Sequence, residues 1–250
     1  MINDASVPRP PLNKAMPRLY GHFLCPYAER VRLALSARNV KFERCEINLK
    51  DKPQWHQEIE GGTIPLLELP AGEILKDSKV LMEYVEETYK NQGYSTLPPD
   101  AKLRAKLRMS IPLAESLFSA WIAVLSLRTY SEPEMKIFNA KLKEIESFLK
   151  DNSITAQFFL GTANPTQLDI HMYACLSRPY FTKNSVFHDE LFKHMHFEEC
   201  ERIVKFIKAM QARPEFQAVL SKEITHHEYL KEVKTTAPGT KVALYLPIAH

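Results

Sequence analysis

A short apolar run followed by a helical pattern organises the N-terminal part of the chain. Residues 19–24 are mostly apolar and stop at Cys25-Pro26, after which apolar residues recur at helical spacing as far as residue 37. Pro26 suits the first turn of a helix, where its missing N–H would have no intrahelical partner. The pattern predicts a strand, a tight junction and a helix, whose polar side is formed by Glu29, Arg30, Arg32 and Arg38.

The stretch that follows, up to about residue 93, adds further strands and a helix. Strand signals lie at 41–49, 66–69 and 73–75. The last two flank a Pro-Ala-Gly turn, which predicts a hairpin, and Ser78 is a good N-cap for a closing helix. This order predicts a thioredoxin-like α/β layer, in which antiparallel strands extend a parallel pair.

From residue 101 to about 222 the pattern is helical, without convincing strands. Apolar residues recur at helical spacing over 103–130, 133–149, 170–176 and 200–213. Thr166 and Asp169 have capping-box spacing ahead of the third stretch, and Pro214 begins a last short helix. No helical period is visible after Thr235. The sequence therefore predicts an all-helical second domain.

Prolines mark two of the boundaries between these parts. Four prolines within residues 7–17 predict an extended arm, and Pro98-Pro99 marks a linker. We expect a Pro-rich N-terminal arm over 1–17, the thioredoxin-like domain over 18–93, the linker over 94–100, the all-helical domain over 101–222 and a C-terminal tail over 223–250.

Composition and charge then restrict the class of protein. A net charge of +3 indicates no polyanionic partner, and the alternating basic residues between Lys102 and Arg108 are typical of a solvated helix start rather than nucleic-acid binding. No apolar window approaches a membrane span, and no signal-peptide pattern is present. Four widely spaced cysteines without a CxxC pair favour a reducing compartment, with the cytoplasm as the expected location.

The strongest chemical signal is Cys25, which the pattern places at the N-terminus of a helix. Unpaired N–H groups and the positive end of the helix dipole lower the pKa of a thiol at such a position, and the thiolate is the nucleophile. The alternative is that Cys25 is a small buried hydrophobic residue. The motif Cys25-Pro26-Tyr27-Ala28 looks like the glutaredoxin CPYC motif with its second cysteine replaced.

The remaining candidates for chemistry are weaker. Cys45 and Cys175 fall in core-like patterns, and acidic neighbours would raise the thiol pKa of Cys200. Tyr20 could be a catalytic tyrosine, but an ordinary strand aromatic is favoured. A histidine-rich stretch has no metal-ligand spacing, so no metal is predicted and a solvated loop is favoured: His188, Asp189, His194, His196, Glu198 and Glu199.

Several motifs together resemble the cytosolic glutathione transferases, specifically the omega class. They are FLCPYAERVRLAL (residues 23–35), INLKDKPQW (47–55), IPLLEL (64–69), ILKDS (74–78) and the capping-box segment through Asp169. The resemblance covers nearly the whole chain, and it implies a thioredoxin-like glutathione-binding domain followed by an all-helical domain.

The resemblance also implies roles for individual residues. Cys25 would be catalytic, and Pro26 and Tyr27 beside it would contact glutathione. A cis proline at Pro65 would let Ile64 exchange main-chain hydrogen bonds with the cysteinyl unit of glutathione. Asp77 and Ser78 would bind the γ-glutamyl group at one end of the tripeptide. Lys52 would pair with the glycyl carboxylate at the other end.

The sequence departs from the family pattern in two places. Asp77 stands where the omega pattern has the longer Glu, and Glu60-Gly61-Gly62-Thr63 replaces the usual Asn-Pro-x-Gly loop before the cis proline. The acceptor pocket would lie between Cys25 and the helical domain, with Leu24, Tyr27, Trp121, Leu125 and Phe206 as candidates. A core position is the alternative for each of these residues.

The resemblance implies a monothiol thioltransferase and dehydroascorbate reductase. Ala28 cannot resolve a mixed disulfide on Cys25, so an external glutathione would have to do so. Glutathione would be the co-substrate, a small-molecule or protein disulfide the partner substrate, and a homodimer the assembly, with no metal, nucleic acid or membrane. A conjugating transferase and a glutathione transferase fold used only for binding or scaffolding remain as alternatives.

Overall fold

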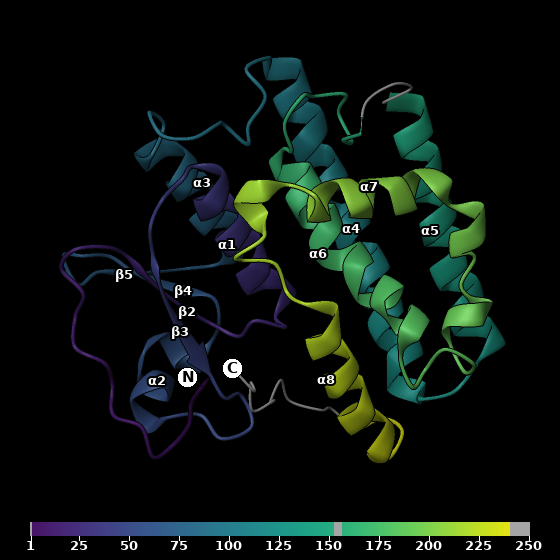
Figure 1. The fold of residues 1–250 in the computed structure, drawn as a ribbon, viewed down its shortest axis with the longest axis horizontal. Helices are drawn as coiled ribbons and strands as arrows, with labels where there is room; N and C mark the ends of the chain where they lie inside the picture. Colours follow the sequence, from purple (N-terminus) through teal and green to yellow (C-terminus); the bar gives the residue numbers. More distant parts are fainter. Residues whose placement is uncertain (1, 153–156, 241–250) are drawn as a thin grey trace. The chain divides into compact units, whose positions relative to one another are not determined.

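The computed structural model describes residues 2–152 and 157–240, which form two compact units (Figure 1). The first unit consists of residues 2–94 together with 218–225. The second contains the described residues of 95–217 and of 226–240. Segment 218–225 therefore belongs to the first unit, although both of its ends continue into the second.

A five-stranded sheet of order β1-β3-β2-β4-β5 forms the centre of the first unit. Its strands are β1 (Ile2–Asn3), β2 (Arg18–Gly21), β3 (Glu43–Ile47), β4 (Leu66–Glu68) and β5 (Ile74–Lys76). Its helices are α1 (Pro26–Ala37), α2 (Gln54–Glu58), η1 (Glu60–Gly62) and α3 (Ser78–Thr88). In Figure 1, α1 and α3 lie on one side of the sheet and α2 lies on the other. The parallel β2–β3 pair and the antiparallel β4–β5 hairpin confirm the predicted thioredoxin-like layer.

A buried ion pair joins the middle strands of this sheet. Arg18 on β2 lies opposite Glu68 on β4, and their side chains, each 3% exposed, meet at 2.8 Å. The hydroxyl of Tyr20 donates to the same carboxylate at 3.0 Å. Because a buried charge must be paired and hydrogen-bonded, these contacts stabilise the face of the sheet on which Tyr20 packs.

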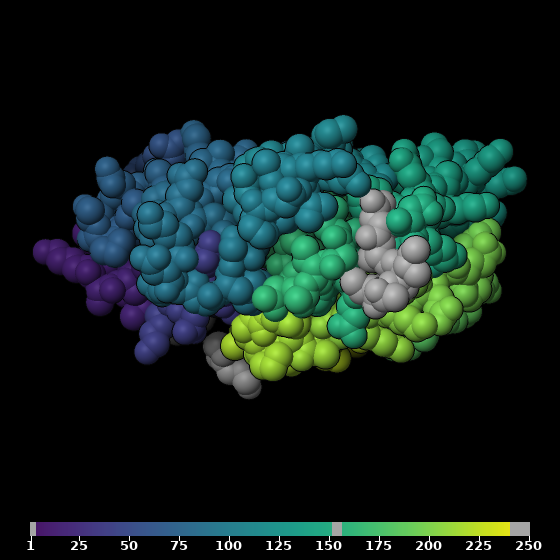
Figure 2. Space-filling view, turned by 90° about the horizontal axis from the view of Figure 1, so that it is seen from above, coloured from purple at the N-terminus to yellow at the C-terminus, as the bar shows by residue number. Residues whose placement is uncertain are grey.

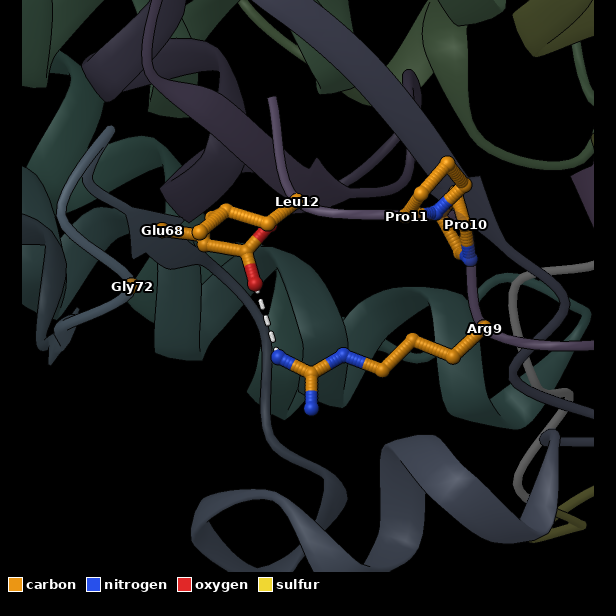
Figure 3. A pocket seen from close by; sticks show the side chains of 6 residues that line it. All are labelled: Arg9, Pro10, Pro11, Leu12, Glu68 and Gly72. Carbon is orange, nitrogen blue, oxygen red and sulfur yellow. Dashed lines mark hydrogen bonds and ion pairs between the residues drawn. The ribbon is translucent and has the colours of Figure 1, made fainter. Parts of the chain in front are cut away.

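The N-terminal arm lies against the first unit. The Trp55 indole donates to the Val7 carbonyl at 2.8 Å, and Arg18 donates to the Pro11 carbonyl at 2.6 Å. Figure 3 shows Arg9 of the arm reaching the Glu68 carboxylate at 2.7 Å across a small pocket. The short strand β1 at the start of the arm was not predicted; it pairs in parallel with β3.

The polar side of α1 does not face solvent. Glu29, Arg30, Arg32 and Arg38 are each at most 5% exposed. Arg38 pairs with Glu86 of α3, and the Arg30 guanidinium lies 4.7 Å from the centre of the Tyr27 ring. Arg38, Arg32 and Glu29 have partners outside the helix, whereas Arg30 lies over Tyr27 within it.

The second unit is built from helices. They are α4 (Ala101–Leu127), α5 (Glu132–Asn152), α6 (Gln167–Tyr180), α7 (Glu201–Gln211) and α8 (Glu223–Thr235), whose first turn belongs to the first unit. Short 3₁₀ turns are η2 (Phe181–Asn184), η3 (Phe192–His194), η4 (Phe197–Glu199) and η5 (Pro214–Phe216). The Asp169 carboxylate accepts the Thr166 N–H at 2.7 Å, which confirms the predicted capping box.

The end of the chain differs from the sequence analysis. The segment predicted as a tail contains α8, whose buried side chains are only His226, Leu230 and Val233, too few for a clear helical period. Arg128 at the end of α4 donates to the Val233 carbonyl at 3.1 Å. Pro214 begins a 3₁₀ turn rather than an α-helix, and the apolar stretch 242–248 lies outside the described residues.

Helix α4 is more apolar than the sequence analysis allowed. By length and composition alone it could span a membrane, and 28% of its most apolar 18-residue window is buried, so the expectation that no window approaches this length is wrong. Its buried residues fall on one face, at the spacing of a helix packed in a bundle: Leu107, Ala114, Leu117, Ala120, Trp121, Val124 and Leu125. Figure 2 shows part of this helix, in blue-teal, at the molecular surface. Met109 and Ile122 of this helix are exposed.

Candidate functional site

The strand register of the first unit brings the predicted glutathione-binding segments to one edge of the sheet. Tyr20 of β2 lies opposite Leu66 of β4, which lies opposite Lys76 of β5. The chain after β2, the residue before β4 and the residue after β5 therefore share this edge. The end of β3 reaches it too, because β3 runs parallel to β2. Each of these segments carries one predicted site residue: Cys25 follows β2, Pro65 precedes β4, Asp77 follows β5 and Lys52 follows β3.

Cys25 is the N-cap residue of α1. Its N–H donates to the His22 carbonyl at 2.8 Å, which closes a tight turn between β2 and the helix, and its carbonyl accepts the Glu29 N–H at 3.0 Å. The side chain is not part of a disulfide, and the residue is 5% exposed. Pro26 occupies the first helical position, and the adjacent Tyr27 is 40% exposed. A thiol at this position lies beside the positive end of the helix dipole.

Ala28 fills the position of a resolving cysteine and packs against β2. It is fully buried, and a Cβ added to Gly21 would lie 3.0 Å from the Ala28 methyl. Glycine at position 21 therefore allows helix and strand to approach closely. The arrangement provides one sulfur in the motif rather than a dithiol.

At the start of α3 the N-cap lies one residue before the predicted one. Asp77, rather than Ser78, is the N-cap, and its carboxylate accepts the N–H groups of Lys79 at 2.8 Å and Val80 at 3.4 Å. Ser78 is the first helical residue and is 6% exposed. Asp77 has a φ of 71°, a left-handed conformation that is uncommon outside glycine. An anion at this helix N-terminus would meet N–H groups and the helix dipole.

The segment from Lys52 to Pro65 is ordered by its own contacts. The Lys52 ammonium donates to the Gly62 carbonyl at 2.9 Å. Three successive residues, Glu60, Gly61 and Gly62, have positive φ, so the replacement of the family's usual loop produces a left-handed turn. The Ile64–Pro65 peptide bond is cis, as predicted.

His56 lies behind this loop and was missed by the sequence analysis. Its imidazole is fully buried and packs near the rings of Tyr20 and Trp55. Burial, together with the nearby Lys52 charge, lowers its pKa to about 4, so the ring is neutral at physiological pH. Its place within a short polar helix gave no sequence signal of this environment.

The other thiols are less suited to nucleophilic chemistry. Burial raises the pKa of Cys45 to about 12 and that of Cys200 also to about 12, with Glu146 and Glu199 adding to the effect on Cys200. Cys175 is fully buried. Tyr20 is fully buried with its hydroxyl directed at Glu68, and burial raises its pKa. Cys200 is also an N-cap residue, at the start of α7, but burial and the nearby carboxylates raise its pKa. Cys25 is the N-cap residue that lies on the edge shared by the predicted glutathione-binding segments.

The candidates for the acceptor pocket are mostly buried. Leu24, Trp121, Leu125 and Phe206 are at most 7% exposed. Phe206 packs edge-on against Phe159 at 4.8 Å, and Trp121 lies 6.4 Å from the Phe138 ring. Tyr27 is the exposed member of the set. An acceptor role for these residues stays a prediction.

The histidine-rich stretch of the second unit has contacts of its own. The Asn139 amide bridges the His194 carbonyl and the His196 N–H, and the His196 ring lies 3.5 Å from Glu199. Among the residues that the structure describes, no group of three or more His, Cys, Asp or Glu side chains is placed to hold a metal ion.

Comparison with known proteins agrees with this geometry. Residues 19–93 match the family model "Glutathione S-transferase, N-terminal domain". The chain is 26% identical to glutathione S-transferase omega-1 of Mus musculus over 92% of its own length and 90% of that relative. The resemblance to omega-class glutathione transferases is thereby confirmed.

Solved structures show the same fold. Glutathione transferase Omega 1C from Trametes versicolor superimposes with a TM-score of 0.72 at 21% identity, over 87% of this chain and 95% of that one. Dehydroascorbate reductase from Chlamydomonas reinhardtii superimposes with a TM-score of 0.67 at 18% identity, over 88% and 99%. At these identities the likeness concerns the fold alone.

Proposed function

We propose that this chain, whose residues 19–93 belong to the glutathione S-transferase N-terminal domain family, is a glutathione-dependent thiol oxidoreductase. In the first step the Cys25 thiolate attacks the glutathione sulfur of a mixed disulfide, and the substrate thiolate leaves and takes up a proton. A second glutathione then attacks Cys25–S–S–glutathione, which releases oxidised glutathione and regenerates the Cys25 thiolate. The net reaction consumes one glutathione thiol for each mixed disulfide, RS–SG + GSH → RSH + GSSG, because the other half of the oxidised glutathione comes from the substrate.

The position of Cys25 carries this proposal. Its thiol lies at the N-terminus of α1, whereas the pKa of Cys45 and that of Cys200 are raised to about 12. The buried methyl of Ala28 stands where a resolving thiol would be, which favours a monothiol cycle over a dithiol one. In a conjugating transferase a hydroxyl would stabilise the glutathione thiolate, but Tyr20 directs its hydroxyl at Glu68.

The same edge of the sheet provides groups for the rest of glutathione. We assign the γ-glutamyl carboxylate to the N-terminus of α3 at Ser78, and the amine to Asp77. Since one Asp77 oxygen already accepts the Lys79 and Val80 N–H groups, the other oxygen would receive the amine. The assignment is completed by the Ile64 main chain before cis-Pro65 at the cysteinyl unit, the Lys52 ammonium at the glycyl carboxylate, and contacts from Pro26 and Tyr27. The acceptor would bind beside Tyr27.

The substrates and the setting follow from this chemistry. Disulfides of glutathione with small molecules or proteins are the first class of acceptor. Dehydroascorbate is the second, reduced to ascorbate by the two electrons and two protons of two glutathiones. The cycle needs reduced glutathione, and this requirement favours the cytoplasm as the location of the protein. We also propose a homodimer, for which the exposed Met109 and Ile122 of α4 offer apolar surface.

Intact-protein mass spectrometry after treatment with oxidised glutathione tests the proposal. The expected result is one glutathione adduct that peptide mapping assigns to Cys25 and that reduced glutathione removes. A parallel assay should show turnover of a glutathione mixed disulfide. An adduct confined to another cysteine, without turnover, would favour a binding or scaffolding role instead.

A further inference from the structure

Segment 218–225 holds the turn that carries Cys25, although it is almost 200 positions away in the sequence. Ser221 is 5% exposed, and its N–H donates to the Glu29 carboxylate of α1 at 2.7 Å. Its hydroxyl donates to the carbonyl of Phe23, two residues before Cys25. Both bonds lie within one compact unit.

Arg32 joins this serine to the same turn. Its guanidinium, 1% exposed, donates to the Phe23 carbonyl at 2.8 Å and to the Ser221 hydroxyl at 3.1 Å. It also donates to the carbonyls of His22 at 3.4 Å and Val219 at 2.9 Å. The two carbonyls of the turn are therefore bound by a charged group that is itself held by segment 218–225.

The N–H side of the turn is also fixed. The Leu24 N–H donates to His22 Nδ1 at 3.2 Å, and the Cys25 N–H donates to the His22 carbonyl at 2.8 Å. With both sides of the peptide groups engaged, the turn has little freedom, and the sulfur of Cys25 is held at the helix N-terminus. Short charge-assisted bonds in a buried site are the strong ones, so their loss should move the turn.

We infer that Ser221 is a positioning residue for the nucleophile: with Arg32 it holds the Phe23 carbonyl and so keeps the Cys25 sulfur at the N-terminus of α1. The inference rests on the proposed role of Cys25. It assigns a function in the reaction to a residue of the C-terminal part of the chain that acts through the turn and α1.

The test compares Ser221→Ala with Ser221→Thr, which keeps a hydroxyl. The control is Ser177→Ala, because Ser177 is also fully buried and its hydroxyl accepts from Arg178 at 3.1 Å. The rate of Cys25 alkylation by iodoacetamide is measured against pH, with peptide mapping to assign the site. We expect Ser221→Ala to raise the apparent pKa of the thiol and to slow alkylation at pH 7 several-fold, since each pKa unit is about 10-fold in thiolate. Ser221→Thr should restore most of the rate, and Ser177→Ala should leave the profile unchanged.

A profile in Ser221→Ala that superimposes on wild type would overturn the inference. If Ser221→Ala does not fold, Arg32→Lys provides the test, because it keeps the positive charge but loses the planar fork that binds both the Phe23 carbonyl and the Ser221 hydroxyl; an unchanged profile there would overturn it equally. Alkylation requires no turnover. Failure of the proposed function would therefore appear separately, as a wild-type chain that alkylates at Cys25 but does not reduce a mixed disulfide.

Discussion

The Glu146 carboxylate of α5 accepts the backbone N–H of Ile203 in the first turn of α7 at 2.9 Å. The same side chain, 3% exposed, accepts the Arg202 N–H at 3.1 Å. A helix leaves its first N–H groups without intrahelical partners, and here a carboxylate from another helix receives two of them. The negative charge also lies at the positive end of the α7 dipole. Glu146 is therefore a cap supplied across the helical unit.

Glu146→Ala should lower the free energy of unfolding by about 1–3 kcal/mol, because it leaves two N–H groups of α7 without their acceptor. Glu144→Ala is the control, since Glu144 is exposed on the same helix and pairs only with Lys141 in the described contacts. That change should cost about 0.5 kcal/mol or less. Urea unfolding of the two variants measures the difference, and equal midpoints would show that the cap contributes nothing.

The Glu68 carboxylate forms two ion pairs, a buried one with Arg18 and a more exposed one with Arg9, so the two can be compared. Glu68→Ala should destabilise the chain by roughly 3–5 kcal/mol, because it leaves the Arg18 charge and the Tyr20 hydroxyl buried with one partner fewer. Arg9→Ala removes a partner that is 43% exposed and should cost about 1 kcal/mol or less. Thermal or urea unfolding distinguishes them. A similar loss of unfolding free energy in both variants would contradict the expectation that the buried Arg18–Glu68 pair contributes more than the exposed Arg9–Glu68 pair.

Local sequence signals predicted the features that depend on neighbouring residues. The junction at Cys25-Pro26, the β4–β5 hairpin and the Thr166–Asp169 capping box each involve residues within a few positions of one another. The choice between Asp77 and Ser78 as the N-cap of α3 was wrong by one residue, because both side chains can accept a helical N–H and only the backbone conformation decides.

Features that depend on distant partners could not be predicted. Glu29 and Arg32 have the charge pattern of a solvent-facing helix side, but their acceptors and donors lie near Ser221, 192 and 189 positions away. Helix α8 was missed for a similar reason: His226, Leu230 and Val233 are buried by the second unit rather than by a regular apolar stripe. His56 gave no signal, because its burial results from the tertiary packing of Tyr20 and Trp55.

His56→Phe should make the chain less sensitive to acid. Burial lowers the pKa of His56 from 6.5 to about 4, so the folded chain binds fewer protons than the unfolded chain between these values. The stabilisation that the neutral imidazole adds to the free energy of unfolding is fully present above pH 6.5 and is lost as the pH falls through 4. His22, also lowered to about 4 by burial, acts in the same direction. The fall in the free energy of unfolding from pH 6.5 to 4 should shrink by up to roughly 3 kcal/mol in His56→Phe.

The control for this measurement is His188→Phe, a histidine exposed to solvent. Its pH dependence should follow that of wild type. Chemical unfolding at several pH values between 4 and 7 gives both curves. A His56→Phe curve parallel to that of wild type would show that His56 is not the buried neutral imidazole described.

Two substitutions of Cys25 separate the reductase from a conjugating transferase. Cys25→Ala removes the attacking sulfur from a helix N-cap and keeps the main-chain hydrogen bonds of the turn, so thioltransferase activity should disappear while the unfolding midpoint stays close to that of wild type. Cys25→Ser replaces the thiol with a hydroxyl, which can hydrogen-bond the glutathione thiolate without forming a disulfide with it. We therefore expect Cys25→Ser to lose reductase activity and to gain conjugation with an electrophile such as 1-chloro-2,4-dinitrobenzene. Turnover of mixed disulfides by either variant would refute Cys25 as the nucleophile. Conjugation by wild type at the rate of Cys25→Ser would show that the Cys25 thiol does not favour reduction over conjugation.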